Sequence, residues 1–354
     1  MHARFGTYIS ERRIDMKGIV TFGELMMRLT PPGFERFTQC NNWCITFGGA
    51  EANVSVALSA WGNKSAFVSK MPCHEIGQAA VNSLAKFGVC TDNIVRGGDR
   101  LGVYYLEKGA GFRPSKVIYD RKNSAFALSV SGEYDWNKIF DNYDWLHVTG
   151  ITAALGENAF MSLMNAVKIA KERGVTVSFD VNYRSKLWTK SQAGETIKKI
   201  LPYVDVLIAN ENQIAELVGV KSPYPAPEND GYSPESNSYM VRELIKTYGF
   251  KAVALTARRT ISSDVNTLRA MLATENEEVF SREYRIDIVD RVGSGDAFAA
   301  GIIHGLKNKI GALRTVEYAT AAATLAHSLE GDYMLCGKDE VEALVQNGSA
   351  KVQR

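Results

Sequence analysis

The feature that most constrains the fold of this chain is a repeated alternation of short apolar runs with amphipathic stretches. The clearest apolar runs are residues 18–24, 144–150, 175–182, 204–210 and 251–257, and the clearest helical stretches are residues 50–62 and 158–174. Strands that are apolar along their whole length are buried on both faces, which is typical of parallel sheets with helical crossovers. The sequence therefore predicts an α/β fold of three layers, with helices on both faces of a mostly parallel central sheet.

Two regions interrupt this alternation. Residues 29–47 and 101–128 contain β-prone runs that are joined by glycine-containing turns, with no helical stretch between the runs. Such consecutive strands predict a small antiparallel sheet attached to the main domain. We expect this small sheet to form a lid over a site at the edge of the central sheet. A plain β-insertion without such a role is the alternative.

We expect residues 16–345 to form a single domain that includes both lid segments. Residues 1–15 precede Met16, which reads as a natural start that leads into the first strand, so we expect them to be a disordered or artefactual extension. They lack the apolar centre of a signal peptide. Residues 221–239 contain four of the nine prolines and few large apolar residues, which predicts a surface loop.

Composition excludes several classes of protein. The formal net charge of +2 argues against a nucleic-acid-binding or membrane-surface protein, and no apolar run is long enough to span a membrane. The five cysteines form no CxxC pair, so neither a disulfide framework nor a zinc site is predicted. The cysteines fit a reducing environment, and we expect the protein to be cytoplasmic.

The segment "DRVGSGDAFAAG", residues 290–301, carries the strongest chemical signal. A Gly-Ser-Gly turn before a helix exposes backbone N–H groups at the positive end of the helix dipole, which favours binding of an anion. Asp296 falls in the first turn of that helix, where an ordinary capping acid is the alternative. Phe298 occupies the third glycine position of a dinucleotide fingerprint, and no Gly-Lys-Ser/Thr ending of a P-loop is present.

A second glycine-rich helix start is "FGGAEANVSVALSAWG", residues 47–62. Its glycines allow a ligand to approach the backbone closely, and Asn53 can form a hydrogen bond with a sugar hydroxyl. A tight turn followed by a capping Glu51 explains this stretch equally well when it is taken alone.

Together, in this order and at this separation, the two segments resemble the paired signatures of the ribokinase-like (PfkB) carbohydrate kinases. The resemblance covers residues 17–340. Within that family the segments "TFGELMMRLTPPGFERF", "VIYDRKNSAFAL" and "FDVNYRSKLW", with the spelling "DRVG", are most similar to the branch that phosphorylates 2-keto-3-deoxygluconate.

The resemblance implies a catalytic role for the C-terminal segment. Asp296 matches the base that takes the proton from the acceptor hydroxyl, and Gly293, Ser294 and Gly295 match the anion hole around the transferred phosphoryl group. Phosphoryl transfer depends mainly on positioning and on charge stabilisation. An aspartate with an ordinary pKa is already ionised at pH 7, and we expect this of Asp296.

The resemblance also implies a set of substrate contacts: Gly48, Gly49 and Asn53 on the sugar, Arg121 and Arg184 on the keto-acid, and Tyr104 and Tyr119 on the lid. Arginine binds a carboxylate through a charge-assisted fork, which agrees with an acidic substrate. For the tyrosines, packing within the lid is the alternative. For Arg184 the alternative is a surface cation, although its place after a strand favours ligand binding.

Nucleotide contacts follow from the same resemblance. Asn210 begins the stretch that matches an Asn-x-x-Glu motif for magnesium and phosphates, but its fourth position is Gln213, and Glu211 is a possible substitute. Thr256 and Arg258 lie where the family has a glycine-rich turn. Arg291 can neutralise phosphates. Ala322 lies in a helix that resembles the adenine side, where helix packing is an equal explanation.

The expected reaction is therefore phosphorylation of 2-keto-3-deoxy-D-gluconate at its 6-hydroxyl by ATP with Mg²⁺. A fructokinase-like or ribokinase-like enzyme, or a sugar-binding regulator without activity, remains as an alternative. The expected partners are a keto-sugar acid and ATP, with no nucleic acid and no membrane. The resemblance also implies a homodimer or a higher homo-oligomer.

Overall fold

The structure is a computed structural model, and it describes residues 17–224 and 233–348. The predicted extension, residues 1–15, lies outside the described residues. So does part of the predicted surface loop, residues 225–232. No helix among the described residues has both the length and the apolar character needed to cross a membrane.

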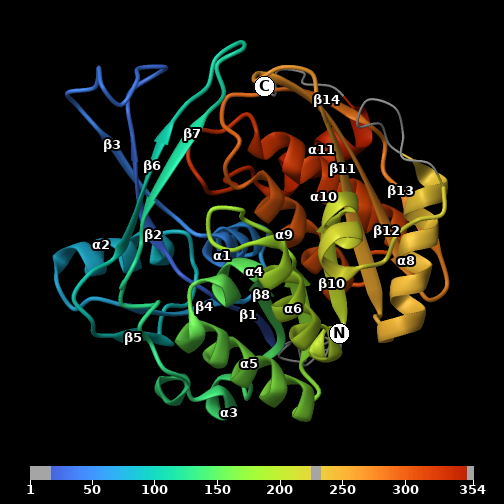
Figure 1. Cartoon of the computed structure of the whole chain (residues 1–354), viewed down its shortest axis with the longest axis horizontal. Coiled ribbons are helices and arrows are strands. Elements are labelled where there is room, and N and C mark those ends of the chain that lie inside the picture. Colours follow the sequence, from blue (N-terminus) through green and yellow to red (C-terminus); the bar gives the residue numbers. More distant parts are fainter. Residues whose placement is uncertain (1–16, 225–232, 349–354) are drawn as a thin grey trace, which may run out of the picture.

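A large sheet runs through the middle of the molecule (Figure 1). Its strands in the described residues are β1 (Gly18–Phe22), β4 (Ser65–Met71), β5 (Ile94–Arg96), β8 (Tyr143–Thr149), β9 (Thr176–Asp180), β10 (Val206–Asn210), β11 (Ala252–Thr260), β12 (Val265–Thr274), β13 (Glu278–Phe280) and β14 (Tyr284–Asp287). They lie in the order β13-β12-β11-β10-β9-β8-β1-β4-β5, and β14 pairs with β12. The strands from β5 to β11 along this order are parallel, which confirms the predicted mostly parallel sheet.

Helices cover both faces of this sheet. One face carries α3 (Trp136–Ile139), α5 (Glu157–Glu172), α6 (Lys190–Ile200) and α8 (Pro234–Tyr248), and the other carries α1 (Ala50–Ala60), α2 (Glu75–Ala85), α9 (Ser294–Lys307), α10 (Ala312–Ala326) and α11 (Lys338–Asn347). Shorter turns are α4 (Gly150–Ala154), α7 (Glu211–Gln213), η1 (Ser131–Glu133), η2 (Leu201–Tyr203) and η3 (Ile214–Val218). The three-layer α/β prediction is therefore confirmed.

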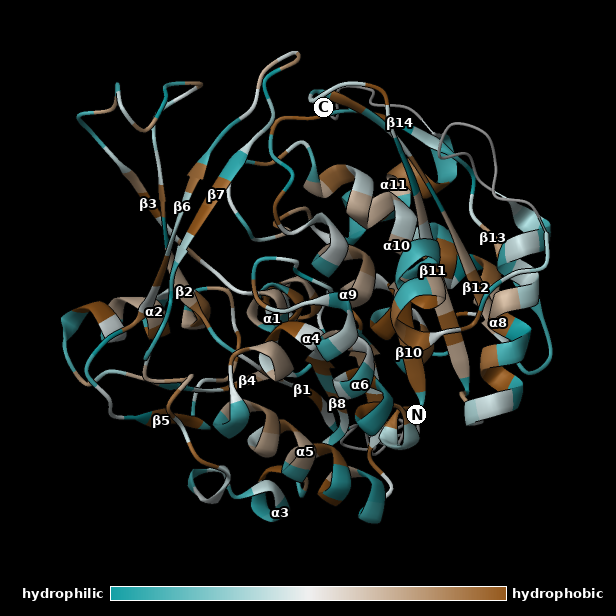
Figure 2. Ribbon diagram, in the orientation of Figure 1, coloured by the Kyte–Doolittle hydropathy of each residue, from teal (hydrophilic) through white to brown (hydrophobic). Residues whose placement is uncertain are grey.

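Side-chain alternation along the strands explains the continuous apolar runs. In β1, Val20 and Phe22 pack into the core beneath α5 and α6, whereas Ile19 packs into the core beneath α9 and α10. Figure 2 shows mainly hydrophobic strands in the middle of the molecule and hydrophilic residues on the outer sides of α3 and α5. Each such fully buried side chain contributes about 1.5–3 kcal/mol to folding.

A second, small sheet stands beside the main body (Figure 1, upper left). It consists of β2 (Met26–Thr30), β3 (Cys44–Gly48), β6 (Gly102–Glu107) and β7 (Lys116–Asp120), in the order β3-β2-β6-β7. Its two outer pairings are antiparallel, as predicted, but β2 and β6 are parallel. The prediction of an all-antiparallel sheet was therefore wrong. Each sequence segment supplies one antiparallel pair, β2 with β3 and β6 with β7, and the two pairs join through β2 and β6, which run in the same direction.

Two further elements differ from the sequence prediction. Strand β11 continues through Arg258 to Thr260 and returns antiparallel as β12, so the glycine-poor segment is a β-hairpin. Helix α8 begins at Pro234, inside the predicted surface loop. Ser233 caps this helix by accepting a hydrogen bond from the N–H of Ser236, and proline suits the first helical position.

Candidate active site

A cavity of about 880 Å³ opens where β9, β10 and β11 end and where α1 and α9 begin, beside the small sheet. Ligands of open α/β sheets bind at the carboxyl ends of the strands. The cavity is lined by the predicted site residues Gly48, Gly49, Asn53, Tyr104, Tyr119, Arg121, Arg184, Asn210, Thr256, Arg258, Arg291, Gly293, Ser294, Gly295 and Asp296. The fold thus brings together residues that lie far apart in the sequence.

Ala322 is the predicted site residue that the structure does not bring to this cavity. Its side chain is fully buried in the core that α10 shares with α9. The two helices approach closely, since a Cβ atom at Gly301 would lie 2.4 Å from the Cα atom of Ala319. The small residues of α10 therefore serve helix packing, which corrects the predicted nucleotide contact of Ala322.

The start of α9 has the geometry of an anion site. Gly293 has φ +82°, in the left-handed region, and a Cβ atom there would lie 2.1 Å from the carbonyl oxygen of Asp332. Glycine is thus required by both conformation and space. No side chain caps this helix, so its first N–H groups face the cavity beside Gly293, Ser294 and Gly295.

Asp296 does not act as a capping residue. Its Oδ2 atom accepts a hydrogen bond of 2.6 Å from Nδ2 of Asn53, in the first turns of α1. Burial raises the pKa of the Asp296 carboxyl to about 7, against the lowering effects of Asn53 and Arg184. This differs from the expectation of an ordinary pKa, because only 8% of the residue is exposed.

A second buried carboxylate, Asp180, lies at the end of β9 and lines the same cavity. Burial and the nearby Asp296 raise the pKa of Asp180 to about 7. Asn182 holds this carboxylate through its backbone N–H (3.0 Å) and its side-chain amide (3.2 Å), and Asn182 itself adopts φ +38°. Asparagine is among the residues that most readily adopt this left-handed conformation, which here turns the chain directly after β9. Sequence reasoning missed Asp180, although it stands in the quoted segment "FDVNYRSKLW".

The two arginines that match keto-acid contacts have different surroundings. Arg121 is buried and paired with Glu24, whose Oε2 accepts from Nε at 2.7 Å and also from Nη2. The side chain of Arg184 is exposed and lines the cavity, and its guanidinium makes no hydrogen bond or ion pair with another described residue. The charge of Arg121 is therefore already compensated, whereas Arg184 carries a charge that is available to a ligand.

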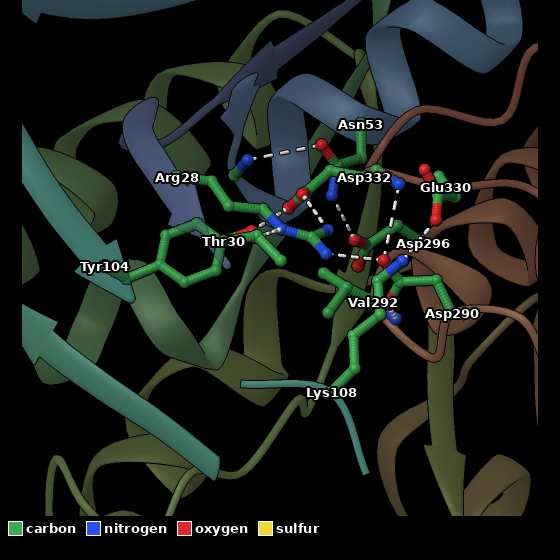
Figure 3. A network of polar contacts seen from close by, with 12 residues as sticks. Arg28, Thr30, Asn53, Tyr104, Lys108, Asp290, Val292, Asp296, Glu330 and Asp332 are labelled. Carbon is green, nitrogen blue, oxygen red and sulfur yellow. Dashed lines mark hydrogen bonds and ion pairs between the residues drawn. The ribbon is translucent and has the colours of Figure 1, made fainter. Parts of the chain in front are cut away.

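A network around Arg28 ties the small sheet to the start of α9 (Figure 3). Arg28, in β2, donates to Asp332 at 2.9 Å and to Asp290 at 2.5 Å, and all three side chains are buried. The hydroxyl of Tyr104, in β6, donates to Asp332 at 2.5 Å. Tyr104 therefore lines the cavity with its hydroxyl already engaged. Sequence reasoning missed Arg28, although a charged residue within an apolar β-strand was a usable signal.

Asn210 and Gln213, which also line the cavity, cap each other. The side-chain oxygen of Asn210 accepts from the N–H of Gln213 at 2.9 Å, and that of Gln213 accepts from the N–H of Asn210 at 3.0 Å. Gln213 is thus a helix-capping residue. Glu211 lines the cavity, and burial raises the pKa of its carboxyl.

Arg258 and Arg291 also line the cavity. Desolvation, together with Arg291 and Arg184, lowers the pKa of Arg258, so the three cations lie close enough to repel one another. One nitrogen of Arg291 also donates to the carbonyls of Ser262 (3.3 Å) and Ser263 (3.0 Å), in the turn of the β11–β12 hairpin. Such a gathering of guanidinium groups favours a ligand with several negative charges.

The cavity combines an anion-binding helix start with a buried acid that can accept a proton, which is the arrangement a phosphotransferase acting on hydroxyl groups needs. The family model for pfkB carbohydrate kinases matches residues 16–335. The chain belongs to this family.

Individual relatives agree with that assignment. A 2-dehydro-3-deoxygalactonokinase of Haloferax volcanii is 33% identical over 95% of this chain and 99% of its own length. A 2-dehydro-3-deoxygluconokinase of Bacillus subtilis is 27% identical over 88% of this chain and 90% of its own length. The crystal structure of 2-dehydro-3-deoxygluconokinase from Thermotoga maritima is 42% identical and superposes with a TM-score of 0.89, covering 93% of this chain and 98% of that one.

Proposed function

We propose that the protein transfers the γ-phosphoryl group of ATP to the 6-hydroxyl of 2-keto-3-deoxygluconate, giving 2-keto-3-deoxy-6-phosphogluconate. The observation that carries this proposal is the shared cavity of Asp296, the bare start of α9 and the unpaired Arg184. The relatives named for 2-dehydro-3-deoxy sugar acids, which are the same class of compound as 2-keto-3-deoxy sugar acids, support it.

The proposed step assigns a role to each part of the cavity. The oxygen of the 6-hydroxyl forms a bond to the γ-phosphorus while the bond from that phosphorus to the β–γ bridging oxygen breaks, and ADP keeps the bonding electrons. The hydroxyl proton passes to Asp296. The N–H groups of Gly293, Ser294 and Gly295 stabilise the charge on the phosphoryl oxygens during transfer.

The carboxylate of the substrate needs a cation that is not already paired. Arg184 meets this condition, whereas Arg121 lines the cavity but is already paired with Glu24. We infer that Arg184 contributes more than Arg121 to the preference for an acidic substrate. Tyr119, whose ring lies 5.7 Å from the guanidinium carbon of Arg121, completes the wall of the small sheet.

Mg²⁺ enters this proposal as part of the nucleotide substrate. Among the described residues no group of three potential metal ligands forms a resident site, and Gln213 is committed to capping. Glu211 is the carboxylate that faces the cavity on the side of Asn210, so it is the residue that would contact nucleotide-bound Mg²⁺ directly or through water. The metal would neutralise the β- and γ-phosphate charge, together with Arg258 and Arg291.

A substrate panel tests the proposed function. The full chain is assayed for ADP release with 2-keto-3-deoxygluconate, its galacto epimer, fructose and ribose, and we expect the largest kcat/KM with a keto-acid. A larger kcat/KM with fructose or ribose would refute the acidic substrate. The variant Asp296→Asn tests the alternative that the protein is a sugar-binding regulator without activity. We expect its kcat to fall by several orders of magnitude while the sugar still binds.

Arg184→Gln extends this test. Loss of a charged hydrogen bond of about 1.5–3 kcal/mol raises the KM for the keto-acid roughly tenfold or more. The KM for a neutral sugar should not change, and Arg173→Gln, at an exposed ion pair with Asp141, serves as the matched control. An equal rise of KM for neutral and acidic sugars would contradict the proposed carboxylate contact.

We further propose that residues 16–345 form one domain whose small sheet is a lid, and that lids of two copies pair to make a homodimer. The lid exposes large apolar side chains, among them Trp43, Ile45 and Ile118. Exposed apolar patches of this kind mark interaction surfaces. Light scattering should give the mass of a dimer, and Ile45→Asp should shift it towards the monomer, whereas a monomeric wild type would refute the pairing.

We infer a reducing compartment such as the cytoplasm as the place of action. All five cysteines are free thiols, and Cys44 and Cys73 are exposed. Exposed thiols persist where the redox poise is reducing. Unchanged activity and mass after treatment with a reductant is the expected result, and intermolecular disulfides in freshly isolated protein would contradict the inference.

A further inference from the structure

Asn53 links the starts of α1 and α9 through both ends of its side-chain amide. Its Oδ1 atom accepts the N–H of Gly49 at 3.2 Å, and its Nδ2 atom donates to Oδ2 of Asp296 at 2.6 Å. Both side chains are buried, with 3% and 8% of each residue exposed. The contact joins residues that are 243 positions apart in the sequence.

The chemistry of the two neighbours fixes the orientation of this amide. The N–H of Gly49 can only donate, so it requires the oxygen of Asn53. The amide nitrogen must then face Asp296, which accepts as a carboxylate. Gly49 is the N-cap of α1 and has no side chain that could cap the helix, and its own N–H is satisfied by Asn53. An aspartate at position 53 would supply no donor and would place a second negative charge against Asp296.

We propose that Asn53 is a positioning residue for phosphoryl transfer: it engages Oδ2 of Asp296, which leaves Oδ1 to take the proton of the acceptor hydroxyl, and it stabilises the ionised form of that carboxylate. This inference rests on the proposed kinase function. It differs from the role that family resemblance gives to Asn53, which is contact with the sugar.

Most of the electrostatic surroundings of Asp296 disfavour its ionised form, which the hydrogen bond from Asn53 stabilises. Burial raises the pKa of this carboxyl, as do the acids that face it from neighbouring elements, namely Glu51 in α1 and Asp332 before α11. The nearby Asp296 in turn raises the pKa of Asp180, at the end of β9. Only Asn53 and Arg184 among the main influences lower the pKa. A hydrogen bond from a neutral amide therefore shifts the balance towards the base form near neutral pH.

The two roles of Asn53 predict different kinetics. A residue that only contacts the sugar changes the KM for the sugar acid and leaves the pH dependence of kcat unaltered. A residue that holds the base ionised changes kcat most at low pH, because a smaller fraction of Asp296 is then deprotonated. The midpoint of the acid limb of kcat is therefore the measurement that separates them.

The test compares wild type with Asn53→Ala, Asn53→Ser and Asn53→Asp between pH 5.5 and 9, using MgATP and whichever sugar the wild type phosphorylates best. We expect the acid midpoint to rise by about one pH unit in Asn53→Ala, so that kcat at pH 6 falls roughly tenfold further than kcat at pH 9. Asn53→Ser can still donate a hydrogen bond and should recover part of the shift, whereas Asn53→Asp should shift the midpoint further than alanine does.

The controls keep this test separate from the proposed function. Wild type that phosphorylates no keto-acid refutes the proposed substrate, but the comparison of midpoints still applies to any sugar that is turned over. Asn82→Ala, an exposed asparagine on α2, should leave both kcat and the midpoint unchanged. If Asn53→Ala does not fold, Asn53→Ser and Asn53→Asp decide. An unchanged midpoint in the folded variants, with only KM raised, would overturn the positioning role.

Discussion

Asp296 lies in a buried environment that disfavours its ionised form. It lies in the first turn of α9 with a hydrogen bond from Asn53, and burial raises its pKa to about 7. The folded state therefore binds a proton between about pH 4 and 7 that the unfolded chain has released, since the ordinary pKa of aspartate is about 3.9. The free energy of unfolding therefore decreases as pH rises from about 4 to 7. Above pH 7 the buried carboxylate is ionised and its full destabilising effect is present.

The first prediction follows from this destabilising effect of ionised Asp296. Asp296→Asn keeps an oxygen for Asn53 and removes the charge, so at pH 8 the variant should be more stable than wild type, by at most about 4 kcal/mol. At pH 5 the gain should be much smaller. Thermal unfolding at both pH values measures the difference, with exposed Asp99→Asn as a control that changes little. A variant less stable than wild type at pH 8 would contradict the cost assigned to burial.

Residue identities were predictable where a short motif carries them. The glycines of the two helix starts and Asp296 stand in contiguous segments whose chemistry can be read locally. Glu24, Arg28 and Asp332 could not be assigned a role in this way, because their partners are distant in sequence. The pairing of Arg121 with Glu24 joins residues 97 positions apart, and nothing local to either indicates it.

At the scale of elements, the start of α9 depends on two glycines for different reasons. Gly293 has a left-handed φ and no room for a Cβ atom, whereas Gly295 has open space around its Cβ position and lies within the helix. Only Gly293 is therefore required by the fold itself. Gly295 leaves free space in the cavity beside Ser294.

The second prediction is a matched pair of substitutions. Gly293→Ala should lower the melting temperature and abolish most activity, because backbone strain and the contact with Asp332 distort the turn. Gly295→Ala should keep or slightly raise the melting temperature, since alanine is favoured in helices by about 1 kcal/mol. Its methyl group should still lower kcat by filling part of the anion site. Equal melting temperatures for the two variants would contradict this distinction.

Elements with a clear pattern of apolar residues were predicted well from the sequence. Elements whose arrangement depends on pairing between distant segments were not. Strands β1, β9 and β10 read as apolar runs because both faces of the central sheet are covered. The parallel pairing of β2 with β6 joins segments separated by α1 and α2, so no local turn signals it. The hairpin of β11 and β12 lacks the glycine-containing turn by which hairpins are usually recognised.

At the scale of the whole molecule, Arg28 is a buried contact between the small sheet and the main body. It neutralises two buried carboxylates, Asp290 from the turn before α9 and Asp332 from the segment before α11. Figure 3 shows how its guanidinium reaches both. Lys108 and Glu330 add an ion pair of 2.5 Å between the same two parts at the surface.

The third prediction concerns this connection. Arg28→Met leaves two buried carboxylates without a cation, which should cost about 3–5 kcal/mol of stability and should also lower kcat through displacement of the turn at Gly293. Arg28→Lys should be intermediate, because one ammonium group cannot bridge both acids as a guanidinium does. Arg100→Met, at an exposed pair with Asp120, should cost less than about 1 kcal/mol. Chemical denaturation measures all three, and a loss in Arg28→Met as small as that in Arg100→Met would contradict the role.

The ion pair of Arg28 with Asp332 spans 304 positions of the chain, so it has a consequence for synthesis. While the protein emerges from the ribosome, β2 is made early, but the acid that its arginine needs is made almost last. The first strands of the parallel sheet can pair early, but Arg28 cannot form its ion pair with Asp332 until residue 332 has left the exit tunnel. A nascent chain halted before that residue should therefore contain much of the central sheet but hold its small sheet less firmly than the full chain does.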